Sequence, residues 1–119
     1  MEVERKQERR DLITYLRVFG ENAEQPVGHL VDITTEGMML ISEEPVETGK
    51  VLQLRVVLPA KIEESKEISL SAKAMWCRED ENPAFYNTGF KLVNPSPEHI
   101  KIIEHLIQRY CFKESLGQL

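Results

Sequence analysis

The sequence lacks the features of a membrane-spanning or exported protein. Its 119 residues contain no apolar run that approaches the ~20 residues of a transmembrane helix. Its first residues, MEVERKQERRD, are charged where a signal peptide would be apolar. It has two cysteines, Cys77 and Cys111, which form neither a CxxC pair nor a Cys/His cluster, so we expect reduced, buried thiols and no zinc site. These absences predict a cytoplasmic protein that does not contact a membrane.

Positive charge and aromatic rings are also scarce. The chain carries 15 Lys+Arg against 20 Asp+Glu, a formal charge of −5, and 7% of its residues are aromatic. Proteins that bind nucleic acids without sequence preference present a basic surface with aromatic rings on which bases stack. The composition therefore argues against a nucleic-acid partner. A small barrel that binds single-stranded nucleic acid is the least favoured of three candidate functions, of which the other two are given at the end of this subsection.

No arrangement of residues points to catalysis. The sequence has neither a Walker-type phosphate loop nor a GxGxxG turn. Its histidines, His29, His99 and His105, lie in a predicted strand and a predicted helix, away from any Gly-rich turn. The acidic pairs Glu43-Glu44 and Glu63-Glu64 fall in predicted loops, where a solvated charged segment is the simplest explanation. We therefore predict that the protein is not an enzyme and uses no cofactor or metal.

Short apolar segments separated by turn residues make up most of the chain. They predict six strands, over residues 12–19, 27–34, 38–41, 51–58, 67–77 and 85–93. The fifth alternates strictly, and the residues predicted to share its buried face are Ile68, Leu70, Ala72, Ala74 and Trp76. Gly89, inside the sixth, predicts a bulge or a close-packing point. Short strands with frequent turns favour an antiparallel sandwich or barrel over a βαβ fold.

The end of the sequence changes to a helical period. Ser96-Pro97-Glu98 places an N-cap residue, a proline and an acid at the start of a helix. Apolar residues then recur at spacings of three and four, at Ile100, Ile103, Leu106, Ile107 and Tyr110. We expect this stripe to cover one end or face of the sheet. The chain divides into a charged, flexible N-terminal arm (1–11), a mainly β domain with a C-terminal helix (12–113) and a tail (114–119).

The N-terminal arm is the first candidate for a binding site. It contains the arginine cluster Arg5, Arg9 and Arg10, and the first 19 residues carry a net charge of +1 while the remaining 100 carry −6. Guanidinium groups are therefore concentrated where the chain enters the fold. The alternative explanation is a solvated, frayed terminus, which is common at the ends of domains.

The turn between the second and third predicted strands is the second candidate. Asp32 and Thr34 offer a carboxylate and a hydroxyl that could bind a ligand, or could cap the turn through hydrogen bonds to its backbone. Gly37 suits either a positive φ or a close approach of the backbone to a ligand. The residues alone leave both alternatives open.

The two candidates together resemble the two-part signature of PilZ domains, RxxxR followed by [D/N]xSxxG. The matching residues are Arg5-x-x-x-Arg9 and Asp32-x-Thr34-x-x-Gly37. Thr34 stands where the signature has serine, which keeps the hydroxyl and adds a methyl group. The resemblance extends from residue 5 to about residue 112. It implies a six-stranded antiparallel β-barrel with a C-terminal α-helix, in a single-domain member of the family.

The resemblance also implies a ligand, the bacterial second messenger cyclic di-GMP, which has two phosphates and two guanines. Arginine binds a phosphate or the O6/N7 edge of guanine through two parallel hydrogen bonds, and it stacks on purines. The carboxylate of Asp32 can accept hydrogen bonds from N1–H and N2–H₂ of guanine. Each charge-assisted bond contributes on the order of 1.5–3 kcal/mol. The implied ligand-binding residues are Arg5, Arg9, Arg10, Asp32, Thr34 and Gly37.

The register of the arginine half stays open. Arg5 with Arg9 completes the motif. If Arg9 takes the first position, the second falls on Ile13 and the motif is broken. In a third register Lys6 pairs with Arg10, and lysine replaces a two-pronged guanidinium poorly.

Two functions follow from the resemblance. The first is a bacterial, cytoplasmic receptor, a monomer or a homodimer, whose arm orders around cyclic di-GMP and relays binding to an unidentified protein effector. The second is a degenerate PilZ-like adaptor that binds a protein without binding nucleotide. An exposed apolar patch combined with no nucleotide affinity would favour the second.

Overall fold

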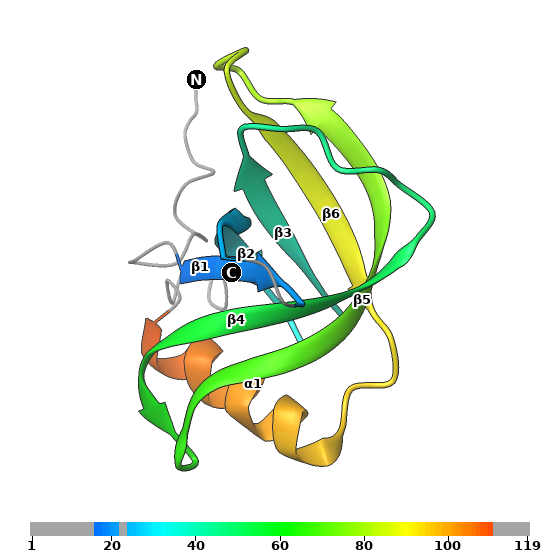
Figure 1. Ribbon diagram of the computed structural model, residues 1–119. Coiled ribbons are helices and arrows are strands. Elements are labelled where there is room, and N and C mark those ends of the chain that lie inside the picture. Colours follow the sequence, from blue (N-terminus) through cyan, green and yellow to red (C-terminus); the bar gives the residue numbers. More distant parts are fainter. Residues whose placement is uncertain (1–15, 22–23, 111–119) are drawn as a thin grey trace, which may run out of the picture.

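The computed structural model describes residues 16–21 and 24–110, which form six strands followed by one helix (Figure 1). In chain order the elements are β1 (Leu16–Gly20), β2 (Pro26–Ile33), β3 (Gly37–Ser42), β4 (Val51–Ile62), β5 (Ser65–Glu79), β6 (Tyr86–Leu92) and α1 (Pro97–Tyr110). Neighbouring strands are antiparallel and close into a barrel in the order β1-β2-β3-β6-β5-β4. The predicted fold is confirmed.

The barrel interior is the hydrophobic core. Between bulges, alternate side chains of the strands point inward, as a period of two requires. The largest fully buried side chains are Leu30, Leu40, Leu54, Ile62, Leu70, Ile103, Leu106, Val18, Val56 and Thr88. Nearly all are aliphatic, so the barrel is stabilised mainly by the burial of apolar surface.

The β4–β5 hairpin is longer than the sequence predicts. β4 continues through Pro59, a residue that normally ends a central strand. Proline is accommodated because neither β1 nor β5 pairs with residue 59, so its missing N–H interrupts no ladder. Glu63 and Glu64 form the turn with φ of 51° and 69°, both in the left-handed region, as in a two-residue hairpin turn.

The prediction that Trp76 shares the buried face of β5 is wrong. The register between β5 and β6 shifts between Ala74 and Trp76, so one extra residue, Met75, interrupts the alternation. Ala74 lies opposite inward-facing Phe90, whereas Trp76 lies opposite Gly89 and points outward. After the bulge Cys77 faces inward, half-buried, and its sulfur accepts hydrogen bonds from the Thr88 hydroxyl (3.3 Å) and the Val46 N–H (3.5 Å). Cys111 lies outside the described residues.

Helix α1 covers one end of the barrel, the lower end in Figure 1. The predicted N-cap is confirmed, since the Ser96 hydroxyl accepts a hydrogen bond from the His99 N–H at 3.1 Å. Ile102, Ile103 and Leu106 are buried in the same cluster as the strand side chains. Because α1 follows β6, the covered end is the one with the β2–β3 turn, and the start of β6 lies at the opposite end. Within residues 16–21 and 24–110, no helix is long and apolar enough to cross a membrane.

Candidate functional site

The β2–β3 turn is held by the side chain of Thr34. Its hydroxyl oxygen accepts hydrogen bonds from the N–H groups of Glu36 and Gly37, each at 3.1 Å, while the Thr34 N–H donates to the Gly37 carbonyl at 2.8 Å. The capping role considered from the sequence is therefore present. The hydroxyl is exposed, and its ligand-binding role stays a prediction.

Gly37 is needed at this turn because of a neighbouring strand. Its φ is outside the left-handed region, so the positive-φ alternative does not apply. A Cβ at this position would lie 2.5 Å from the backbone carbonyl oxygen of Phe90 on β6, closer than real side chains approach. The glycine therefore allows β3 and β6 to approach closely beside the turn.

Asp32 is directed to the outside of the barrel by a second bulge. The register between β2 and β3 shifts between Leu30 and Asp32, with Val31 as the extra residue. Asp32 is half-buried and its Oδ1 accepts a hydrogen bond from the Ile33 N–H at 3.0 Å. The carboxylate is thus fixed at the outer surface, directly before the turn that Thr34 caps.

One outward-facing row runs across four strands and joins Asp32 to Trp76. Asp32 lies opposite Met39, Met39 opposite Gly89, and Gly89 opposite Trp76. Three strand spacings separate the ends of the row, roughly 14 Å of backbone. A shallow groove of about 280 Å³ follows it, hereafter the outer groove, lined by Asp32, Ile33, Thr34, Gly37, Met38, Met39, Met75, Trp76, Gly89 and Phe90. The groove has a carboxylate at one side and an indole at the other.

The indole reaches toward the middle of the groove because Gly89 has no side chain. A Cβ on Gly89 would collide with the six-membered ring and Nε1 of Trp76, so the predicted close-packing point is confirmed. The guanidinium of Arg78 lies over the Trp76 ring, 4.7 Å from its centroid. Sequence reasoning missed Trp76 as a groove residue, and with it the neighbouring Arg78, because it placed Trp76 in the core. The sequence feature that could have indicated this contact is the combination of one tryptophan, Trp76, with a glycine, Gly89, inside the next predicted strand.

Two lysines flank the outer groove beside the turn. Lys91 lies opposite Gly37 and also directly opposite Lys73, and both ammonium groups are exposed. Like charges directly opposite one another in a sheet are destabilising. Among the described residues, neither lysine has an ion pair with an acid. The barrel itself therefore places positive charge next to the turn.

The predicted arginines Arg5, Arg9 and Arg10 lie outside the described residues, so their register stays open. β1 begins at Leu16, which pairs with Leu30, two residues before Asp32. The chain therefore enters the barrel beside the end of β2 that carries Asp32. Across the described part of the chain, no three His, Cys, Asp or Glu side chains cluster in a way that could hold a metal ion.

Comparisons with known proteins agree with this architecture. The model of the PilZ domain family matches residues 4–113 of the chain. A similar solved structure is the Bacillus subtilis inhibitor of motility, MotI/DgrA, with a TM-score of 0.65 and 17% sequence identity. The alignment covers 89% of this chain and 53% of MotI/DgrA, so the chain spans about half the length of that protein. At this identity the likeness shows the fold alone. No curated protein matches the sequence.

Proposed function

The chain belongs to the PilZ domain family, whose members are receptors and adaptors, and we propose that it is a receptor that binds cyclic di-GMP in the outer groove. The observation that carries this proposal is the outward-facing row from Asp32 to Trp76. Two separate bulges are needed to bring these two side chains to the same outer surface. Bulges often occur next to functional sites, where they redirect a side chain. The two bulges that place Asp32 and Trp76 on the same outer surface are therefore explained if these side chains bind a ligand.

Asp32 recognises guanine in this proposal. A carboxylate has about four lone-pair sites, so it can accept the bond from Ile33 and further bonds from N1–H and N2–H₂ of the base. Adenine lacks this pair of donors. The carboxylate would therefore set the preference for guanine over adenine.

The phosphates are bound by cations from two sources. Lys73 and Lys91 lie beside the turn, where a bound anion would relieve their mutual repulsion. The arm supplies Arg5, Arg9 and Arg10, which precede the strand that enters next to Asp32. Thr34 and Gly37 keep the turn compact so that ligand and backbone can approach.

Trp76 provides an apolar surface for the second base. Stacking of a base on an aromatic ring is worth about 1–3 kcal/mol. Arg78, which lies over the same ring, can stack on a purine or bind the O6/N7 edge of guanine. The site thus combines hydrogen-bonding groups that select guanine with an aromatic ring that stacks on any purine.

Isothermal titration calorimetry of the full chain with cyclic di-GMP tests the proposal, with GTP and cyclic di-AMP as controls. Wild-type protein should bind cyclic di-GMP with a micromolar or lower Kd. Arg9→Ala and Asp32→Asn should each weaken binding by about tenfold or more, because each removes a charge-assisted bond. Lys73→Gln/Lys91→Gln should weaken binding and reduce its salt dependence. Lys61→Gln/Lys66→Gln, the same charge change near the β4–β5 turn, should leave binding unchanged.

Two results would contradict the proposal. One is the absence of heat and of NMR shifts with excess cyclic di-GMP. The other is equal weakening of cyclic di-GMP binding by the Lys73/Lys91 and Lys61/Lys66 double variants, since this would show that binding depends on the net charge of the protein and not on the position of the lysines. The first result would favour the second candidate function, a PilZ-like adaptor, which is supported by an apolar pocket at the other end of the barrel.

A further inference from the structure

A second hollow opens at the end of the barrel opposite α1. It has a volume of about 690 Å³, within the range of roughly 300–1,000 Å³ that is common for binding sites. It lies between the start of β2, the end of β3 with the loop that follows, and the starts of β4 and β6. We call it the mouth pocket. It shares one residue, Phe90, with the lining of the outer groove.

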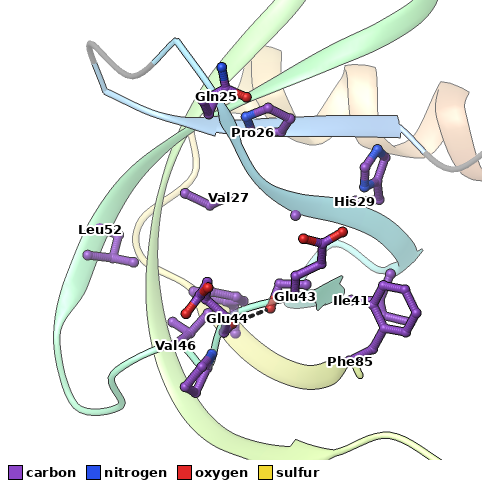
Figure 2. A pocket seen from close by; sticks show the side chains of 14 residues that line it. Gln25, Pro26, Val27, His29, Ile41, Glu43, Glu44, Val46, Leu52 and Phe85 are labelled. Atoms are coloured by element: carbon purple, nitrogen blue, oxygen red, sulfur yellow. Dashed lines mark hydrogen bonds between the residues drawn. The ribbon is translucent and has the colours of Figure 1, made fainter. Parts of the chain in front are cut away.

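The wall of the mouth pocket is mostly apolar. Figure 2 shows Val27 and Leu52 on one side of the space, and Ile41 and Phe85 on the other. Val27 is 37% exposed and is one of three large hydrophobic side chains that are exposed among the described residues. The pocket thus offers an apolar side chain a place out of water.

A strand edge borders the same pocket. β2 pairs with β1 from Pro26 onward, but its register with β3 begins only at His29. Among the described residues, the backbone of residues 26 and 27 therefore has no partner on the β3 side. Gly28 marks the point where the strands meet, since a Cβ there would lie 2.6 Å from the Ile41 carbonyl oxygen. An extended segment can add backbone hydrogen bonds along such an edge.

Two carboxylates stand at the rim of the pocket, whose other polar residues are Gln25, His29 and Ser42. Glu43 and Glu44 follow β3 directly and are exposed. Figure 2 shows the Glu43 side chain projecting from this loop toward β2, between Val27 and His29. In the part of the chain that the structure describes, neither carboxylate has an ion-pair partner. Two adjacent negative charges at an apolar pocket complement a ligand that is apolar and positively charged.

We infer that the mouth pocket binds an extended peptide segment of a protein partner, in which an apolar side chain lies next to Lys or Arg. The apolar side chain fills the space between Val27 and Phe85, and the cation pairs with Glu43 and Glu44. The start of β2, where Pro26 and Val27 have no partner in β3, favours a peptide over a small molecule because it can pair with a peptide backbone. The same carboxylates repel phosphates, so nucleotide is not the occupant.

This site goes beyond the proposed receptor function and does not depend on it. The mouth pocket and the β2–β3 turn lie at opposite ends of the barrel. A protein that failed to bind cyclic di-GMP could still bind a peptide here, and the reverse is equally possible. Cyclic di-GMP calorimetry and peptide titration therefore report separately on the two proposals.

The test is an NMR titration of the full, isotope-labelled chain with two synthetic peptides. The probe is acetyl-Lys-Leu-Phe-Lys-amide, and its charge-reversed control is acetyl-Glu-Leu-Phe-Glu-amide. The basic peptide should shift the amide resonances of Val27, His29 and Phe85, and the acidic peptide should not. Glu43→Gln/Glu44→Gln should weaken binding of the basic peptide about fivefold, as loss of two rim ion pairs predicts.

The matched control variant is Glu63→Gln/Glu64→Gln. It removes the same two charges from exposed, adjacent positions at the opposite end of the barrel. It should bind the basic peptide as the wild type does. Four results would overturn the inference. The first is the absence of shifts at about 5 mM peptide, a concentration well above the Kd of even a weak specific site. The others are shifts centred on Trp76, equal shifts with both peptides, and equal effects of the two double variants. Concentration-dependent broadening of the mouth resonances without peptide would assign the pocket to a second copy of the chain and would also overturn it.

Discussion

At the end of the barrel where β6 leads into α1, Ile102, Ile103 and Leu106 complete the hydrophobic core, and each is at most 4% exposed. At the opposite end no helix is placed over the strands among the described residues, and the mouth pocket opens between β2 and the β3–β4 loop. Both ends are built from the same six strands. The difference is that a helix of the chain covers one end, whereas the mouth pocket stays open at the other end among the described residues.

The comparison separates residues that hold the fold from residues available for binding. Apolar side chains at the covered end have lost contact with water, so their removal leaves a cavity. Apolar side chains at the mouth keep part of that contact, and Val27 is 37% exposed. Variants at the covered end should therefore change stability, whereas variants at the mouth should change binding and leave stability nearly intact.

The largest effect is expected for Leu106→Ala, because this side chain is fully buried between α1 and the barrel. Its truncation should lower the free energy of unfolding by about 2–5 kcal/mol. Val27→Ala at the mouth should lower it by less than about 1 kcal/mol, since the side chain is already partly solvated. Urea denaturation followed by circular dichroism measures both. Equal losses in the two variants would show that the mouth is as firmly packed as the helix-covered end.

Two glycines give a finer version of the same comparison. Gly37→Ala near the covered end and Gly28→Ala at the mouth each bring a Cβ within 2.6 Å of a backbone carbonyl oxygen. At Gly37, β3 pairs with β6, and every following residue of β3 is paired with β6 as well, so β3 cannot move away from the new Cβ. The free energy of unfolding of Gly37→Ala should therefore fall by about 1–3 kcal/mol. At Gly28, β2 pairs with Val18 of β1 but has no ladder partner in β3, so the backbone can shift away from Ile41 more easily and the loss of stability should be smaller. Denaturation midpoints measured side by side check the order, and a larger loss for Gly28→Ala would contradict it.

Much of the fold could be predicted from the sequence because its signals are local. Alternating apolar residues place strands, and Ser96-Pro97 places the start of α1, which the hydrogen bond from His99 confirms. The sequence does not place strand ends where pairing with a neighbouring strand decides them. Pro59 stops a strand only if a neighbour needs its N–H, and the sequence does not say which strands are neighbours.

The candidate site was predictable only in part, for a related reason. The motif from Asp32 to Gly37 is contiguous and could be found by spacing, whereas Trp76 comes from another strand and faces outward because of one extra residue. A bulge reverses every following side chain, and alternation alone cannot place it. The lysine pair was missed in the same way, because Lys73 and Lys91 meet only through strand register.

The smallest effect, and the sharpest separation of binding from stability, is expected for Glu43→Gln/Glu44→Gln. Exposed substitutions that break no contact usually change stability by less than about 0.5 kcal/mol. Within the described chain these carboxylates pair with no cation, and they repel one another, so neutralising both should leave the denaturation midpoint unchanged or slightly raised. A clear loss of stability would mean that the two acids stabilise the folded structure around the mouth pocket. Weaker peptide binding by this variant could then no longer be attributed to the loss of contacts with the peptide alone. An unchanged midpoint combined with weaker binding of the basic peptide would show that one end of the barrel maintains the fold while the other remains available to a partner.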